Sequence, residues 1–261
     1  GLCPDCQGEI RYTGFGTQRV EEELEQRFPK ANILRMDLDS TRRKGAHEGM
    51  LRDFKKGKYD ILLGTQMVAK GLDFERVGLV GVIGIDSLLF SQGYRAYEHV
   101  FSLVTQVVGR AGRTGEQGRA VIQTMDPENP VLTLAARQDY PAFYEQEIAF
   151  RKMALYPPLC SLCVVGFTAS EEKNAVEAAR QFALLLSEAA KGKPDLPLRI
   201  LGPAPMHVAQ LAGVWRWRLT LKCRADAAFR ALLAEVLQAY YQRGLGRKAL
   251  VYLDFNPDAV N

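Results

Sequence analysis

The sequence predicts an α/β protein of two domains, a doubly wound parallel sheet followed by a smaller α+β domain. In the first half, short apolar runs alternate with amphipathic helical patterns, as in the βα units of parallel sheets. In the second half, the pattern of elements changes to βαββαβ. The chain has 261 residues with 47% hydrophobic side chains, which is near twice the usual domain size and ample for two cores.

Four apolar runs in the first half predict buried parallel strands. The strands are expected at residues 33–36, 61–63, 79–85 and 120–123, with helices at residues 20–28, 48–55 and 96–109. This alternation predicts a RecA-like sheet over residues 12–130. A long amphipathic stretch then predicts a helical linker over residues 131–158, which Tyr156-Pro157-Pro158 ends because proline supplies no N–H and disfavours helix before it.

The second domain, residues 159–261, follows the order βαββαβ. Its strands are expected at residues 161–168, 198–201, 214–223 and 249–255, with helices at residues 173–191 and 225–243. This order is the split arrangement of ferredoxin-like domains.

Composition limits the class of protein. No uncharged apolar run approaches the roughly 18 residues of a membrane span, and no amino-terminal signal pattern is present, so we expect a cytoplasmic protein without a membrane partner. Five cysteines, an odd number, favour reduced thiols, with metal binding as the main alternative. A net charge of +4 is compatible with nucleic acid as a partner.

The segment Q-V-V-G-R-A-G-R at residues 106–113 has the spacing of a phosphate clamp. Gln106, Arg110 and Arg113 fall at i, i+4 and i+7, which predicts one helical face. Gly109 and Gly112 remove bulk beside each arginine, so two guanidinium groups can approach one γ-phosphate during phosphoryl transfer. The alternative is an arginine-capped helix end, since cations favour a helix C-terminus.

Two further segments have phosphate-binding character. G-T-Q-M-V-A-K-G-L-D-F at residues 64–74 follows a strand, so Thr65 lies at the carboxyl edge where open sheets bind ligands. G-F-G-T at residues 14–17 opens a helix that starts near Arg19, where backbone N–H groups and the Thr17 hydroxyl could hold a nucleic-acid phosphate.

The strand at residues 214–224 separates aromatic from basic side chains by period-2 alternation. Trp215 and Trp217 are expected in the core, while the opposite face meets the phosphates of a ligand. That basic face contains Arg216, Arg218, Lys222 and Arg224. Stacking of the tryptophans on bases, or a solvated face covered by acidic side chains, are the alternatives.

The cysteines fall into two groups. Cys3 and Cys6 have the C-x-x-C spacing of a zinc knuckle, but tetrahedral zinc needs four ligands, so this is half a site. Cys160 and Cys163 have the same spacing, yet they enter a strand whose i and i+3 side chains point to opposite faces. Cys223 lies on the core face of its strand.

In this order, the motifs resemble the second motor lobe of superfamily 2 helicases, and more closely the family of primosomal replication-restart DNA helicases (primosomal protein N prime). The motifs that carry this resemblance span almost the whole chain: C-P-D-C at 3–6, G-F-G-T-Q-R-V-E-E-E-L at 14–24, D-L-D-S-T at 37–41, G-T-Q-M-V-A-K-G-L-D-F at 64–74, Q-V-V-G-R-A-G-R at 106–113, Y-P-P at 156–158, and G-P-A-P at 202–205 followed by W-R-W-R.

The resemblance implies an ATP-dependent helicase that moves 3′ to 5′ at stalled or branched forks and starts primosome assembly. Arg110 and Arg113 would contact the γ-phosphate of ATP bound on the other motor lobe, and Gln106 would couple that site to DNA. Gly71 and Asp73 would approach the nucleotide and its Mg²⁺-bound water. Residues implied to hold the DNA backbone are Gly16, Thr17, Thr65 and Lys70.

The resemblance also implies protein partners, zinc ligands upstream of this sequence and an ATP-binding lobe that this sequence does not include. Residues 1–11 would end a zinc-binding insertion, so Cys3 and Cys6 would share Zn²⁺ with ligands upstream. The second domain would bind DNA, single-stranded DNA-binding protein and primosome loading proteins, although Val214 and Arg218 depart from the family's G-R-Y-R-W-Q run for the tail of single-stranded DNA-binding protein. The loop G-x-x-x-x-G-K-[ST] is absent from the sequence, so we expect a fragment that hydrolyses no ATP alone.

Two other functions stay open. One is a translocase that moves along duplex DNA or migrates branches without separating strands. The other is a non-catalytic DNA-binding scaffold whose ATPase has decayed. The zinc half-site and the second domain favour strand separation, and the paired arginines argue against decay.

Overall fold

The computed structural model describes residues 16–37, 46–65, 77–91, 93–109 and 118–257. The chain forms two compact units. The first contains the described residues of Gly1–Ser91 and Ala96–Phe143, and the second those of Gln92–Arg95 and Tyr144–Asn261.

The first unit alternates strands and helices, as predicted. Its elements are α1 (Thr17–Arg27), β1 (Ile33–Met36), α2 (Ala46–Lys55), β2 (Ile61–Gly64), β3 (Leu79–Val82), α4 (Asp86–Leu89), α5 (Ala96–Val108), β4 (Arg119–Ile122) and α6 (Pro130–Ala136). Strand β1 pairs in parallel with β2, from Ile33 opposite Ile61 to Met36 opposite Gly64, and β3 pairs in parallel with β4. Among the described residues, these parallel pairs form two two-stranded sheets.

Strand β3 is shorter and more exposed than the sequence predicts. It ends at Val82 instead of reaching residue 85, and Gly84 beyond it has φ +69°, a left-handed conformation that suits glycine and breaks the extended chain. Leu79 is 62% exposed, whereas Val82 packs against the core. The expectation that both faces of this strand are buried is therefore wrong for the described residues.

The core of the first unit lies along α5. Val100, Phe101 and Val104 are buried at helical spacing and pack on α6. Phe101 stacks on Phe143 at the start of α7 (Tyr140–Ala154), with ring centroids 4.3 Å apart. Helix α6 therefore belongs to the first unit, whereas α7 belongs to the second unit from Tyr144 onward.

The second unit confirms the predicted βαββαβ order. Its elements are β5 (Ser161–Ala169), α8 (Glu172–Lys191), β6 (Leu198–Leu211), β7 (Val214–Cys223), α9 (Ala227–Gln242), a 3₁₀ helix (Leu245–Arg247) and β8 (Leu250–Phe255). The sheet has the order β6-β7-β5-β8 with every neighbouring pair antiparallel. Each βαβ segment therefore has one strand inserted between its two strands, which is the ferredoxin-like topology.

Strand β6 is much longer than the predicted strand at residues 198–201. A register shift follows Leu201, where Gly202 has φ +104°, and pairing with β7 resumes at Ala204. A bulge of this kind lets a strand continue past residues that cannot join the ladder. The strand then reaches a hairpin turn at Ala212 and Gly213, both with positive φ, as two-residue hairpin turns require.

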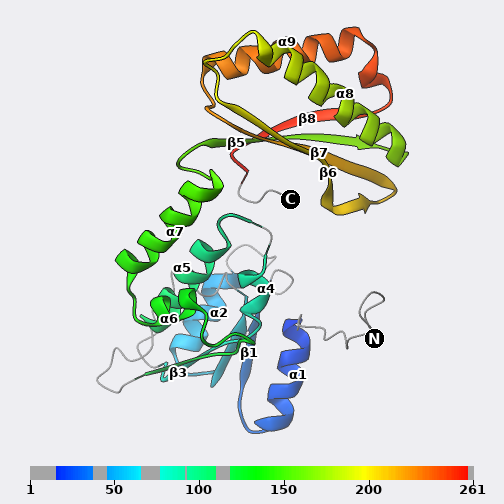
Figure 1. Ribbon diagram of the computed structural model, residues 1–261. Helices are drawn as coiled ribbons and strands as arrows, with labels where there is room; N and C mark the ends of the chain where they lie inside the picture. Colours follow the sequence, from blue (N-terminus) through cyan, green and yellow to red (C-terminus); the bar gives the residue numbers. More distant parts are fainter. Residues whose placement is uncertain (1–15, 38–45, 66–76, 92, 110–117, 258–261) are drawn as a thin grey trace, which may run out of the picture. The chain divides into compact units, whose positions relative to one another are not determined.

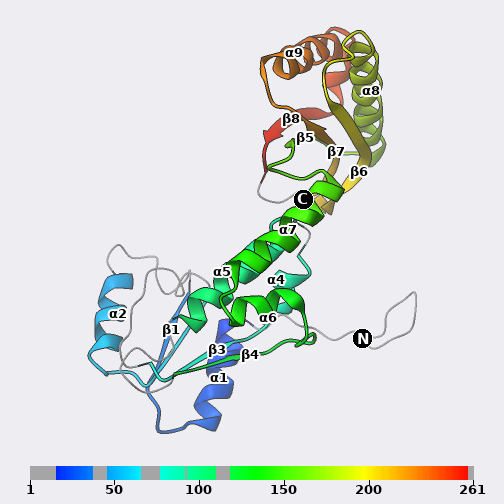
Figure 2. The ribbon, with the colours of Figure 1, turned by 60° about the vertical axis from the view of Figure 1, so that its left-hand side comes forward.

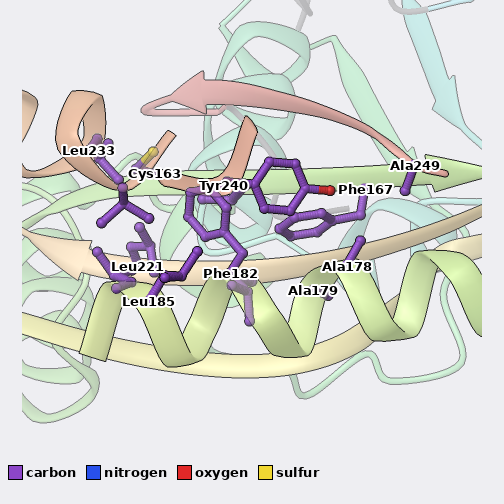
Figure 3. Close-up of a cluster of buried hydrophobic side chains, with 14 of the residues drawn as sticks. Cys163, Phe167, Ala178, Ala179, Phe182, Leu185, Leu221, Leu233, Tyr240 and Ala249 are labelled. Carbon is purple, nitrogen blue, oxygen red and sulfur yellow. The ribbon is translucent and has the colours of Figure 1, made fainter. Parts of the chain in front are cut away.

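Both helices of the second unit lie on the same side of its sheet (Figures 1 and 2). Alternate residues of β5 face them, so Cys163, Val165 and Phe167 are fully buried. At the centre of this core, Phe182 of α8 packs edge to face on Phe167 and on Tyr240 of α9, at centroid distances of 5.5 and 5.7 Å (Figure 3). Phe182 thus connects the sheet with both helices.

The tryptophans of β7 pack on this core, as the period-2 alternation predicts. Trp215 and Trp217 are partly buried against the helix-facing cluster, and Cys223 is buried on the same face. The indole N–H of Trp217 is buried and has no hydrogen-bond partner among the described residues. The core interpretation is therefore confirmed, and base stacking by Trp217 is disfavoured.

Candidate functional site

Gln106 lies near the end of α5, which stops before both predicted clamp arginines. The Gln106 side-chain amide donates to the Ser102 hydroxyl over 3.1 Å, and the helix ends at Val108. Arg110 and Arg113 lie outside the described residues. The single helical face expected for Gln106, Arg110 and Arg113 therefore stays a prediction.

The start of α1 has a polar network that the sequence motifs did not predict. Gly16 caps the helix without a side-chain hydrogen bond, and the Thr17 hydroxyl donates to Asp37 over 3.1 Å. Arg35 joins Asp37 and Glu21, at 3.0 and 2.7 Å. The Thr17 hydroxyl proton is therefore engaged inside the protein, so a phosphate at this helix start would be bound by backbone N–H groups. The signal for Asp37 in the sequence was its place directly after a strand.

Thr65 occupies the predicted sheet edge. It is exposed and follows β2, whose last residue, Gly64, lies opposite Met36, so Thr65 and Asp37 leave adjacent parallel strands at the same carboxyl edge. Ligands bind at this edge in open α/β sheets. Lys70, Gly71 and Asp73 lie outside the described residues.

The basic residues of β7 lie on the sheet face opposite the helices. Arg216 and Arg218 stand opposite Thr168 and Gly166 of β5 in the ladder. Arg224, beyond the strand, pairs with Asp226 over 2.6 Å. Burial lowers the pKa of Arg218 from its ordinary value, because a cation is less well solvated there. Its charge is therefore partly desolvated before any ligand binds.

Lys222 already has partners inside the second unit. Its ammonium group donates to the Ala154 carbonyl over 2.6 Å and lies 4.0 Å from the ring centroid of Tyr156. Burial is the largest cause of the lowered pKa of Lys222. The cation–π contact offsets part of that desolvation.

A pocket of about 220 Å³ opens beside these cations. It is lined by Tyr156, Leu201, Gly202, Ala204, Arg218, Thr220 and Lys222. The two cations of this pocket, Arg218 and Lys222, can hold an anionic group by charge-assisted hydrogen bonds. The pocket therefore favours a ligand that carries a phosphate or a carboxylate group.

The sequence matches known proteins along most of its length. Residues 11–115 match the helicase conserved C-terminal domain, and residues 152–258 match the primosomal protein N C-terminal domain. Replication restart protein PriA from Bacillus subtilis is 41% identical over 256 residues, which cover 98% of this chain and 31% of that protein. The protein of the same name from Haemophilus influenzae is 37% identical over 98% of this chain and 34% of its own length. The one from Synechocystis is 40% identical over 85% of this chain and 26% of its own length.

The chain belongs to the PriA family. It spans about a third of the length of the PriA relatives from Bacillus subtilis and Haemophilus influenzae. The two matched domains follow the order of the two units, a parallel α/β unit and then an antiparallel α+β unit. The predicted fold class and the predicted resemblance are thus both confirmed.

The cysteines within the described part of this PriA-family chain are free thiols. Burial raises the pKa of Cys163 and of Cys223 to about 12 and also raises the pKa of Cys160. Such thiols stay protonated at neutral pH, and a protonated thiol is a poor metal ligand. Among the described residues, no cluster of three or more His, Cys, Asp or Glu side chains could hold a metal ion. Cys3 and Cys6 lie outside those residues.

No helix in the described part of the chain is both long and apolar enough to cross a bilayer.

Proposed function

We propose that this chain forms the second motor lobe and the C-terminal domain of an ATP-dependent DNA helicase that restarts replication in the cytoplasm. The observation that carries this proposal is the match of a helicase C-terminal domain and a primosomal protein N C-terminal domain, in this order, on one chain. The enzyme would bind stalled or branched forks, unwind DNA 3′ to 5′ and start primosome assembly. Its protein partners would be single-stranded DNA-binding protein and primosome loading proteins.

Within that enzyme, Arg110 and Arg113 would stabilise the charge that spreads over the γ-phosphate of ATP. Gln106 would link this site to DNA, and its place near the end of α5 supports a role beside the arginines. Gly71 and Asp73 would lie by the nucleotide and its Mg²⁺. Cys3 and Cys6 would bind Zn²⁺ together with two further ligands, because structural zinc takes four.

The DNA backbone would lie along the first unit at Gly16, Thr17, Thr65 and Lys70. The exposed position of Thr65 at the carboxyl edge of β2 supports this. So does the start of α1, where the N-cap Gly16 supplies no side-chain hydrogen bond and backbone N–H groups favour an anion. In the second unit, the basic strand residues, Arg216, Arg218, Lys222 and Arg224, would follow phosphates.

Unwinding of a forked DNA substrate tests the proposed function. A protein that contains this chain and its ATP-binding lobe is expected to separate the strands with ATP and to leave them paired with a non-hydrolysable analogue. The 261-residue chain alone is expected to bind the fork without ATP turnover. ATP-driven movement without strand separation would instead indicate a duplex translocase, and binding without any ATP turnover by the longer protein would indicate a scaffold.

Charge reversal on the basic strand is expected to weaken DNA binding in a salt-dependent way. If Arg216 and Arg218 each contact a phosphate, the variant R216E/R218E should make the negative slope of log K against log[salt] shallower by roughly 2, since each duplex phosphate contact contributes about −0.9. Fluorescence anisotropy of labelled duplex DNA between low and moderate salt measures this slope.

A matched control is available on the helices, which cover the other face of the sheet. Arg180 of α8 and Arg230 of α9 are exposed, so R180E/R230E makes the same change in net charge away from the basic strand. We expect the control to keep the wild-type slope. Equal slopes for wild type and R216E/R218E would mean that this face does not meet phosphate.

A further inference from the structure

A tyrosine ring lies on the sheet face of the second unit that is opposite the helices. Tyr252 of β8 stands opposite Gly166 of β5 in the antiparallel ladder, so both residues belong to that face. A Cβ atom added at Gly166 would overlap with the Cζ and Cε1 atoms of Tyr252. The ring therefore lies directly over Gly166, in space that the side chain of any other residue would fill.

The ring is held in place but only partly covered. Its phenolic O–H donates to Sδ of Met206 over 3.5 Å, and Met206 is buried. Tyr252 nevertheless keeps 36% of its surface exposed. Because the inner side of the ring meets Gly166, the exposed part belongs to its outer side. A fixed aromatic ring with an open side can stack on a planar ligand at little cost in conformational entropy.

Two arginines stand beside this ring on the same sheet face. Gly166 also pairs with Arg218 of β7, so Tyr252 and Arg218 lie in one row across the sheet, two strand spacings or about 10 Å apart. Arg216 follows in the next row, opposite Thr168. Arg218 is partly desolvated, and a charge interacts more strongly with an anion where water is excluded. One flexible polyanion can therefore reach the ring and both cations.

The rows on either side of Tyr252 give this surface a direction. Leu250 shares a row with Arg216 and is 64% exposed, so apolar surface continues beside the cations. Asp254 stands in the row on the other side of Tyr252, opposite Val164. A polyanion therefore gains most by running from Tyr252 toward Arg216, away from this carboxylate.

We propose that this face binds single-stranded DNA, with an unpaired base stacked on Tyr252 and the neighbouring phosphates at Arg216 and Arg218. The inference rests on the proposed function, in which these arginines meet DNA phosphates, and it adds that the strand is unpaired there. Every base has a π face that an aromatic side chain can cover, but a base inside a duplex has both faces occupied by its neighbours. RRM domains bind single strands in this way, through aromatic residues on the open face of a four-stranded sheet.

Binding of a labelled oligothymidylate to the 261-residue chain, measured by fluorescence anisotropy, tests the inference. The variant Y252L should lower the affinity roughly 5- to 150-fold, the effect of losing one base–aromatic stack. Y252F keeps the ring and should bind within about 2-fold of wild type. The slope of log K against log[salt] should stay the same in Y252L, because stacking neutralises no phosphate. Affinity for a duplex of the same length should not change.

Two controls separate stacking from general damage. Tyr241 of α9 is 56% exposed and belongs to a helix on the other side of the sheet, so Y241L should bind as wild type does. An abasic strand of the same length has the phosphates without the bases, so wild type and Y252L should bind it equally. Equal affinity of wild type and Y252L for oligothymidylate would overturn the proposal. An equal loss of affinity for both strands in Y252L would overturn it too.

Photocrosslinking of the wild-type chain gives a second readout that requires no folded variant. A single strand that contains 5-iodouracil should crosslink on irradiation to the peptide that carries Tyr252, as mass spectrometry detects. Crosslinks that avoid this peptide would contradict the stacking. The measurement needs neither ATP nor strand separation. If the longer protein unwinds no DNA, the proposed function fails, while the crosslink still decides whether a base lies on Tyr252.

Discussion

Replacing Arg113 by alanine, in a protein that contains this chain and its ATP-binding lobe, is expected to reduce ATP turnover by about 10³- to 10⁵-fold. The guanidinium would stabilise negative charge on the equatorial oxygens of the transferred phosphoryl group, and alanine supplies no replacement. Unwinding of forked DNA should be lost with the turnover. DNA affinity should persist, because the expected phosphate contacts lie at other residues. Steady-state ATPase and fork-unwinding assays on the same preparation measure both effects.

A second arginine of the same unit provides the control for this substitution. Arg119 lies on β4, six positions after Arg113, and it is exposed. R119A removes the same side chain without entering the predicted clamp, so its turnover should stay near wild type. If R113A hydrolyses ATP at the wild-type rate, Arg113 does not contact the γ-phosphate. The paired arginines would then be the helix-end cations of the alternative interpretation.

Phe182→Ala is expected to destabilise the second unit by about 3–5 kcal/mol, since it removes a fully buried ring. The cost combines the lost transfer free energy with the cavity left behind. Phe182 also packs edge to face on Phe167 and Tyr240, so two aromatic pairs are lost at once (Figure 3). Both tryptophans of the chain are in β7 and pack on the same core, so urea unfolding followed by tryptophan fluorescence reports on this unit.

Helix α8 offers a matched control for this cavity. Leu184 lies two residues from Phe182 on the same helix but is 61% exposed. L184A should change the free energy of unfolding by less than about 0.5 kcal/mol, because little burial is lost. A loss as small for F182A as for L184A would contradict the packing of this core.

Local patterns in the sequence predict much of the fold. Strand β1 has the predicted bounds, and α5 starts at the predicted Ala96, because an apolar run and a helical period are properties of neighbouring residues. The alternation in β7 likewise predicts which side chains reach the core. The predicted length of β6 was wrong. Whether the strand continues past Gly202 depends on pairing with β7, and local propensity does not include that pairing.

The sequence likewise predicted only some features of the candidate site. Thr65 was predicted at a sheet edge and lies there, because strand order and residue order determine that position. The Asp37 partner of Thr17 and the ion pair of Arg35 with Glu21 were not predicted. These contacts join residues 14 to 20 positions apart, and their geometry depends on how α1 packs beside β1.

The sequence by itself determined the class of each unit and the family, because these depend on residue type and spacing. Only the tertiary structure decided that the Tyr252 ring lies over Gly166, on the face that carries Arg216 and Arg218. Which residue stands opposite Tyr252 depends on the register of β8 against β5, and no pattern of neighbouring residues records that register.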